Sequence, residues 1–232
     1  MNYEEYLLAK ERRLEICIDH MRNGVNFVDI ESAYIDETVV IGEGTLIGPC
    51  VTIEGNTVIG KNCSILQNTR IKDSIIGDEV EITASHVTES KVGDKTKVGP
   101  FAYLRPKSDI GKNCKVGDFV EVKNSTFGDG SKASHLTYIG DSDVGENVNL
   151  GCGVVFVNYD GTNKFRSTIG DGVFIGCNTN LVSPVNVEKG AYIAAGSTVT
   201  EDVPENALCI ARSRQKNIEG WAVTKGLYRK NK

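Results

Sequence analysis

The sequence predicts an all-β chain wound as a parallel β-helix, preceded by an α-helix and followed by a basic tail. Three observations support this fold class. An aliphatic residue returns every six positions over most of the 232 residues, glycine is abundant at 25 residues, and aromatic residues make up only 7% of the chain. A period of six suits the short sides of a triangular coil and cannot be sustained by an α-helix, which turns every 3.6 residues.

Residues 1–24 are expected to form a helix that caps or links the β-helix. Apolar residues recur there at helical spacing among acidic and basic ones, at Leu7, Leu14, Ile18 and Met21. Asn23 and Gly24 then give a helix stop. A solenoid needs such a cap, because its terminal coil would otherwise expose the apolar interior.

Residues 25–204 are expected to form the β-helix. The longest unbroken runs of periodic aliphatic residues extend from Ile41 to Ile71, from Val92 to Val122 and from Ile169 to Val199. About 27 such hexads, at three per triangular coil, predict about nine stacked coils. Glycine often follows the aliphatic residue, and we expect it to let the backbone turn at the corner.

Two segments depart from this rhythm. Between Phe156 and Ile169 the chain reads VNYDGTNKFRST, which predicts a loop that leaves the coil, and such loops often carry function. Residues 205–232 are expected to form a C-terminal tail. From Arg212 onward the tail holds seven Lys or Arg against one Glu, a composition typical of a solvated segment.

The overall composition excludes several functions. A net charge of -5 argues against nucleic-acid binding, which requires clustered positive charge. The seven cysteines form no CxxC pair, and neither a signal peptide nor a membrane segment is recognisable. Reduced thiols and a cytoplasmic location, with no membrane partner, are therefore expected.

Few residues are candidates for chemistry. Hexapeptide proteins can bind zinc through three histidines, as in the gamma-type carbonic anhydrases, and this chain has His20, His86 and His135. His20 lies outside the coils, and the separation of His86 from His135 is not a whole number of coils, so no metal site is expected. His135, in GSKASHLTYIGD, is the leading candidate for a general base.

Arg105 and Lys123 each follow a periodic aliphatic residue and stand one coil apart, so their side chains are expected to stack. Stacked cations repel each other unless an anion lies between them, which favours a phosphate clamp. The alternative is ordinary surface pairing with acids such as Glu121 or Asp118.

From about Leu7 to its C-terminus, the chain resembles a known family over the motifs YLRP, FVEVKNS, GSKASHLTYIGD, NVNLGCG, NYDGTNKF, IAAGSTVTEDVPENAL and IARSRQ. The family is the bifunctional N-acetylglucosamine-1-phosphate uridyltransferase and glucosamine-1-phosphate acetyltransferase, and the resemblance is to its acetyltransferase half. It implies a left-handed parallel β-helix and a homotrimer with active sites between subunits. Nothing before Ile41 resembles the uridyltransferase half, so no uridyl transfer is expected of this chain.

The resemblance also implies roles for individual residues. His135 would take a proton from the sugar amine, and the sugar phosphate would be bound by Arg105 and Lys123. The remaining substrate contacts would come from Tyr138 and Asn149 on the sugar, from Asn158 and Tyr159 beside the acetyl group, and from Lys164 reaching across the subunit boundary.

The implied cosubstrate is acetyl-CoA. Its contacts would be Asn158 and Tyr159 near the acetyl group, Cys152 and Ala195 along the pantetheine arm, and Arg212 near a phosphate. Cys177 departs from the family, where a Ser often contacts acetyl-CoA, and a thiol is the weaker hydrogen-bond partner. An acyl-carrying role for Cys177 or Cys152 is not favoured, because no base accompanies either of them in the sequence.

The function implied is acetyl-CoA-dependent conversion of glucosamine-1-phosphate to N-acetylglucosamine-1-phosphate, a step in UDP-N-acetylglucosamine biosynthesis for the cell wall and its peptidoglycan. One alternative is a non-catalytic hexapeptide protein that assembles or regulates a complex. The other is the metal-dependent anhydrase described above.

Overall fold

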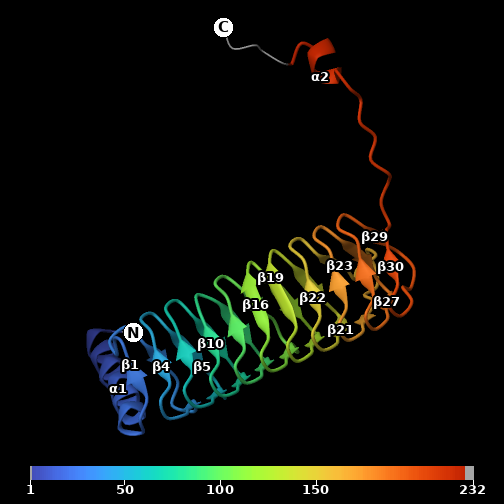
Figure 1. Ribbon diagram of the computed structural model, residues 1–232. Coiled ribbons are helices and arrows are strands. Elements are labelled where there is room, and N and C mark those ends of the chain that lie inside the picture. The colour runs from blue at the N-terminus through green and yellow to red at the C-terminus, as the bar shows by residue number, and fades with distance from the viewer. Residues whose placement is uncertain (1, 228–232) are drawn as a thin grey trace.

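The computed structural model describes residues 2–227, and residues 228–232 of the expected tail lie outside it. The chain forms a three-sided prism of stacked coils, with a helix across one end and an extended segment leaving the other (Figure 1). The strands of each side pair in parallel with the strand one coil away. The predicted fold class, a left-handed parallel β-helix with an N-terminal helix, is confirmed.

Among residues 2–227, the strands form three sheets, one on each side of the prism, which we call A, B and C. Sheet A has 11 strands: β1 Asn26–Phe27, β4 Leu46–Ile47, β7 Ser64–Ile65, β10 Glu81–Ile82, β13 Lys97–Val98, β16 Lys115–Asp118, β19 Lys132–His135, β22 Asn149–Leu150, β25 Phe174–Ile175, β28 Tyr192–Ile193 and β30 Leu208–Cys209. Sheet B has 10: β2 Tyr34–Ile35, β5 Thr52–Glu54, β8 Arg70–Lys72, β11 His86–Thr88, β14 Tyr103–Leu104, β17 Glu121–Lys123, β20 Tyr138–Gly140, β23 Val155–Val157, β26 Asn180–Val182 and β29 Thr198–Val199. Sheet C has nine: β3 Val40–Ile41, β6 Val58–Ile59, β9 Ile75–Ile76, β12 Lys91–Val92, β15 Asp109–Ile110, β18 Thr126–Phe127, β21 Ser142–Val144, β24 Ser167–Ile169 and β27 Asn186–Val187.

The periodic aliphatic residues line the inside of the prism, as predicted. Those in the three long runs are at most 7% exposed, and the shorter runs add Phe127 and Phe156, which are also buried. The coils begin earlier than the first predicted hexad, because the buried Ile35 already occupies the position six residues before Ile41. At the other end, β30 pairs with β28 inside the segment expected to be a tail.

With the exception of Gly99 (φ 100°), the glycines that directly follow the periodic residues do not have a positive φ and so do not supply the corner turn. Gly42, for example, does not have a positive φ, but a Cβ there would lie 2.6 Å from the backbone of Gly60 in the next coil. The positive-φ positions are separate and are often asparagine, such as Asn62 and Asn113, which tolerates the left-handed region better than most residues. The predicted reason for these glycines was therefore wrong: they allow close stacking of coils.

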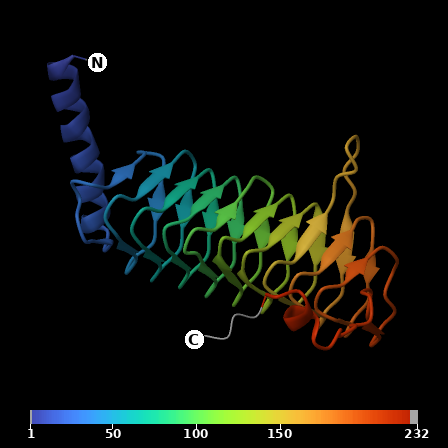
Figure 2. The same ribbon diagram turned by 90° about the horizontal axis from the view of Figure 1, so that it is seen from above.

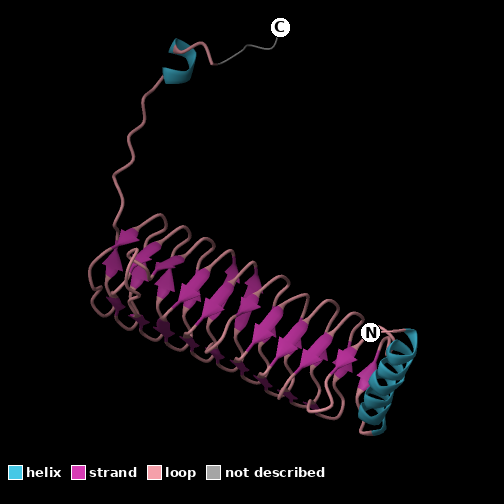
Figure 3. Ribbon diagram, turned by 180° about the vertical axis from the view of Figure 1, so that it is seen from behind, coloured by secondary structure: helices cyan, strands magenta, loops and turns pink. Residues whose placement is uncertain are grey.

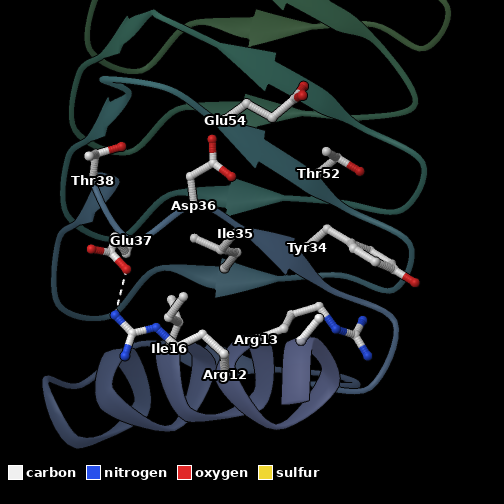
Figure 4. A pocket seen from close by; sticks show the side chains of 11 residues that line it. Arg12, Arg13, Ile16, Tyr34, Ile35, Asp36, Glu37, Thr38, Thr52 and Glu54 are labelled. Atoms are coloured by element: carbon white, nitrogen blue, oxygen red, sulfur yellow. Dashed lines mark hydrogen bonds and ion pairs between the residues drawn. The ribbon is translucent and has the colours of Figure 1, made fainter. Parts of the chain in front are cut away.

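Helix α1 (Tyr3–Arg22) closes the first coil, as expected for the N-terminal cap. It begins with a capping box between Asn2 and Glu5, and its own residue Cys17 is fully buried in the hydrophobic core. The Arg13 guanidinium lies 4.3 Å from the ring centroid of Tyr34 on the first coil. Residues of both the helix and the first coils line a hollow of about 890 Å³, where Arg12 and Glu37 form an ion pair of 2.6 Å (Figure 4).

The second helix, α2 (Trp221–Thr224), lies at the end of the extended C-terminal segment, away from the prism (Figure 3). Its residues are exposed, as are Ile218 and Leu227 beside it. Among residues 2–227, neither helix combines the length and the apolar character needed to cross a bilayer.

Candidate active site

The outer face of sheet B carries a group of the side chains singled out in the sequence, among them Arg105, Lys123 and Tyr138. In each middle coil, two residues of sheet B face outward, one on either side of the buried aliphatic residue. Each of them lies in register with the corresponding residue of the next coil. One column runs from Tyr103 through Glu121 to Tyr138. The neighbouring column runs from Arg105 through Lys123 to Gly140, as hydrogen bonds and strand pairing show. The predicted stacking of Arg105 on Lys123 is thus present.

Both stacked cations also have a carboxylate partner. Arg105 donates a hydrogen bond of 2.7 Å to Glu121, as the surface-pairing alternative predicted. Lys123 lies 3.6 Å from Asp141, an acid for which the sequence predicted no role. Lys164 is a third cation here: the neighbouring ammonium of Lys123 lowers the pKa of Lys164. Three cations around two carboxylates leave positive charge available for an anion.

Asp141 organises this end of the site. Its side chain is 10% exposed, and its two oxygens accept hydrogen bonds from the side-chain amides of Asn124 and Asn158. Burial acts to raise the pKa of Asp141, but the two amides and the charges of Lys123 and Lys164 outweigh it and hold that pKa below its ordinary value. Asp141 is therefore a buried anion that fixes its partners in place.

Gly140 creates a notch in the outer face between these groups. A Cβ at Gly140 would lie 2.4 Å from the Tyr138 hydroxyl oxygen and 2.8 Å from the Asn158 amide nitrogen. These two polar atoms are 3.5 Å apart and occupy the space that a side chain would fill. The notch thus brings together Tyr138 and Asn158, which were both predicted site residues.

The predicted loop leaves the prism after β23 and projects outward (Figure 2, yellow-orange). Within it, Tyr159 and Lys164 form an antiparallel bridge, and the Asp160 carboxylate accepts two backbone hydrogen bonds that close its turn. The returning strand is anchored by Arg166, which bonds to Asp143 and to the Asn124 carbonyl. The turn closed by Asp160 and the anchoring contacts of Arg166 therefore fix the loop, which carries Lys164 beside Lys123.

His135 lies at the edge between sheets A and B, at the end of β19. Its Nδ1 atom is 2.7 Å from Oδ1 of Asp118, which ends the neighbouring strand β16. Both side chains are partly open to solvent, at 54% and 37% exposed. Asp118 therefore pairs with the histidine and not with the stacked cations.

The same edge carries the residues expected to contact the cofactor, in coil order. Cys152, Cys177 and Ala195 occupy the turns after β22, β25 and β28, and successive turns are joined by backbone hydrogen bonds of 2.8 Å. Arg212 lies beside the last of these turns, because its Cδ would be 3.7 Å from a Cβ at Gly196. The edge is thus a continuous strip running from His135 to Arg212.

Apolar side chains continue this edge on the other side of His135. The rings of Phe101 and Phe119 stack at a centroid distance of 5.5 Å, and Leu136 occupies the equivalent position one coil further along. All three are more than half exposed and have positive φ. Bulky residues rarely adopt that conformation. The backbone at these three positions is therefore strained, and their side chains form an exposed apolar strip.

The remaining residues named from the sequence lie on three different elements, β22, α1 and β11. Asn149 lies on sheet A, beside Lys132, and is half-buried. His20 lies in α1, and His86 lies on sheet B against Tyr103. Within the described part of the chain, no three His, Cys, Asp or Glu side chains gather as metal ligands would.

Similarity to known proteins defines the class. The bacterial transferase hexapeptide model matches residues 89–124 and 166–201, and the GMPPB C-terminal domain model matches residues 29–105. The chain is therefore a hexapeptide-repeat protein, in agreement with its period and its coils.

Sequence identity to curated proteins named bifunctional protein GlmU defines the particular family. The relative from Clostridium beijerinckii is 58% identical over 91% of this chain and 47% of its own length. That from Clostridioides difficile is 58% identical over 92% and 46%. The chain spans about half the length of the curated relatives it matches. It belongs to the GlmU family as the C-terminal, hexapeptide-repeat part, which confirms the resemblance carried by its motifs.

Solved structures agree on the fold. The UDP-N-acetylglucosamine acyltransferase LpxA from Bacteroides fragilis matches with a TM-score of 0.58 at 17% identity, covering 76% of this chain and 69% of that one. The Arabidopsis UDP-N-acetylglucosamine acyltransferase matches with a TM-score of 0.54 at 20% identity, over the same shares of each chain. At this identity the likeness supports the β-helix alone.

Proposed function

We propose that this chain transfers the acetyl group of acetyl-CoA to the amine of glucosamine-1-phosphate, giving N-acetylglucosamine-1-phosphate for UDP-N-acetylglucosamine synthesis. The observation that carries the proposal is the cation cluster and polar notch on the sheet B face, together with a histidine at the edge of that face, in a chain 58% identical to GlmU proteins. Each of these three features matches one requirement of the reaction.

The cation cluster fits the sugar phosphate. Lys123, Arg105 and Lys164 present three positive charges, of which two carboxylates offset only part. A phosphate monoester carries up to two negative charges and accepts several hydrogen bonds, so it relieves the repulsion between the ammonium groups. Tyr138 and Asn158 at the Gly140 notch then supply hydrogen bonds to sugar hydroxyls, with Asn149 as a further expected contact.

The reaction needs one proton acceptor. His135 takes a proton from the sugar amine as the amine nitrogen forms a bond to the thioester carbonyl carbon. The tetrahedral intermediate then collapses, the carbon–sulfur bond breaks, and the proton passes to the CoA sulfur. The backbone N–H of Tyr159 in the loop is suited to stabilise the developing oxyanion, whereas that of Asn158 already donates to the Phe156 carbonyl at 2.9 Å. General-base help of this kind is worth about 100- to 10,000-fold in rate.

The strip from Cys152 to Arg212 fits an extended acyl donor. Consecutive turns carry small side chains, at Cys152, Cys177 and Ala195, so a pantetheine arm can lie along them. Arg212 at the end of the strip supplies a positive charge for a CoA phosphate. The donor therefore runs along the prism edge with its thioester directed toward His135.

Assembly as a homotrimer is part of the proposal. The exposed strip of Phe101, Phe119 and Leu136 borders His135, and an apolar strip at a strained surface is suited to packing against a second copy. A single prism offers an open face, and a neighbouring prism would close the face into a groove. The net charge of -5 and the seven free thiols support a cytoplasmic protein without nucleic-acid partners.

The test is acetyl transfer by the purified protein, followed as free thiol released from acetyl-CoA. We expect release with glucosamine-1-phosphate and much slower release with glucosamine-6-phosphate, because the cation cluster fixes where the phosphate sits relative to His135. Equal rates with both sugars would contradict the assigned phosphate site. No release with either sugar would favour the alternative of a non-catalytic assembly or regulatory subunit.

A further inference from the structure

We propose that Asp118 is a positioning residue for His135: its carboxylate holds the neutral imidazole as the Nδ1–H tautomer, so that Nε2 is the nitrogen that accepts the substrate proton. This inference rests on the proposed role of His135 as the base. It adds a residue that no motif in the sequence indicated and that acts through the histidine without touching the substrate.

The contact itself is the first argument. Oδ1 of Asp118 lies 2.7 Å from Nδ1 of His135, a short distance for a nitrogen and a carboxylate oxygen. The two residues are register partners in the parallel pairing of β16 with β19. Each of these strands has four residues, whereas the other strands of sheet A have two. Sheet A is thus extended only where it carries this pair.

The backbone around the pair is the second argument. Gly117 precedes Asp118, and a Cβ there would lie 2.0 Å from the Ser134 carbonyl oxygen. Without that Cβ, β16 approaches β19 closely enough to bring the carboxylate to the ring. Beyond the pair, the Leu136 N–H donates to the Asp118 carbonyl at 2.9 Å. The main chain is therefore held on both sides of the contact.

The chemistry of the two groups gives the consequence. An ionised carboxylate only accepts hydrogen bonds, so the ring nitrogen facing it must carry the proton. In a neutral imidazole the other nitrogen, Nε2, then has the free lone pair. Burial acts to raise the pKa of Asp118, but backbone and His135 hydrogen bonds outweigh it and keep that pKa below its ordinary value. The carboxylate is therefore ionised at neutral pH and can accept a hydrogen bond from Nδ1–H.

The direct test is nitrogen NMR of protein labelled with 15N-histidine, which is tractable because the chain has three histidines. At alkaline pH, the His135 ring should show a protonated Nδ1 and an unprotonated Nε2. In Asp118→Ala the two shifts should move toward each other as the tautomers interconvert. A wild-type ring with protonated Nε2, or shifts unchanged by Asp118→Ala, would overturn the proposal.

A matched control is available on the same prism. The Asp94 side chain is 37% exposed, as is that of Asp118, and it also pairs with a base one coil away, Lys112, at 2.9 Å. Asp94→Ala should leave the His135 signals unchanged. If it moves them as much as Asp118→Ala does, the effect is a general change in charge or fold and the proposal fails.

Kinetics give the second readout. Asp118→Ala should lower kcat by about 10- to 100-fold, less than the roughly 100- to 10,000-fold expected for loss of the base itself, with KM for both substrates changed less than about 2-fold. Asp118→Glu, which retains a carboxylate, should recover part of the loss. Unchanged kcat would show that Asp118 is dispensable. If His135→Ala is itself fully active, the proposed base is wrong, while the tautomer result still tests the contact.

Discussion

The first coils and the middle coils share one backbone plan but treat charge differently. In the first coils, outward cations have an acid one coil away, as in Arg70 with Glu54 at 2.6 Å and Lys97 with Glu81 at 3.2 Å. In the middle coils, Arg105, Lys123 and Lys164 gather around Glu121 and Asp141. These ion pairs balance surface charge in the first coils, and the middle coils depart from that balance at the proposed site.

The two regions also differ in what their glycines make possible. In the first coils, glycines such as Gly42 only allow the backbones to stack. In the middle coils, Gly117 and Gly140 allow a side chain to reach a partner: Asp118 reaches His135, and Tyr138 reaches toward Asn158. The first coils thus supply matched controls for residues in the middle coils.

The largest contrast is expected between the histidines of the two regions. His135→Ala should lower kcat by about 100- to 10,000-fold, because it removes the proposed base. His86→Ala, which removes a ring packed against Tyr103 in an earlier coil, should leave kcat within about 2-fold of the wild type. Steady-state thiol-release kinetics, with circular dichroism to check the fold, measure both. Similar losses in the two variants would contradict the assignment of the base.

The next contrast concerns two lysines in the same outward column. Lys123→Ala should raise KM for glucosamine-1-phosphate by about 10- to 100-fold, because a charge-assisted contact is worth about 1.5–3 kcal/mol. Lys72 occupies this column in an earlier coil, beside Glu54, and Lys72→Ala should leave KM unchanged. Initial rates over a range of sugar phosphate concentrations make the comparison. An unchanged KM in Lys123→Ala would place the phosphate elsewhere.

Much of this arrangement could be predicted from the sequence because a solenoid converts spacing into contact. Arg105 and Lys123 stack since they stand one coil apart, and the turns bearing Cys152 and Cys177 adjoin for the same reason. Asp118 and Asp141 could not be predicted so readily. They are two of 31 acidic residues, and the one-residue slips in the period hide which histidine or lysine each of them faces.

The loop marks a second limit of the sequence. Its departure from the prism could be predicted from the broken period, but the position of Lys164 depends on the turn closed by Asp160 and on the anchoring by Arg166. None of these contacts repeats from coil to coil, so no spacing rule applies to them. Lys164 lies beside Lys123 within the chain, and its predicted reach across a subunit boundary stays a prediction.

A smaller effect is expected for the buried acid of the middle coils. Asp141→Asn places an amide NH₂ where a carboxylate oxygen accepts a hydrogen bond from Asn124 or Asn158. The free energy of unfolding should fall by about 1–3 kcal/mol, the cost of an unsatisfied buried group. Asp94→Asn, on the exposed surface, should change it by less than about 0.5 kcal/mol. Urea unfolding at neutral pH compares the two.

The pH dependence of this loss has a definite sign. The folded-state pKa of Asp141 lies below the ordinary value of 3.8, so ionised Asp141 favours the folded state at neutral pH. That contribution is fully present above the ordinary pKa and is lost as the pH falls through the folded-state value. The stability gap between wild type and Asp141→Asn should therefore narrow below about pH 3.8. A gap that widens in acid would contradict the assigned hydrogen bonds.

The smallest contrast concerns two exposed cysteines on the same prism edge. Cys177 lies on the strip proposed for the acyl donor, and Cys50 lies on the equivalent turn among the first coils. Cys177→Ser should lower KM for acetyl-CoA by no more than about 3-fold, because a hydroxyl is a better hydrogen-bond partner than a thiol. Cys50→Ser should have no effect, since no donor reaches that turn. A loss of kcat above about 10-fold in Cys177→Ser would instead indicate that the thiol itself takes part in acyl transfer.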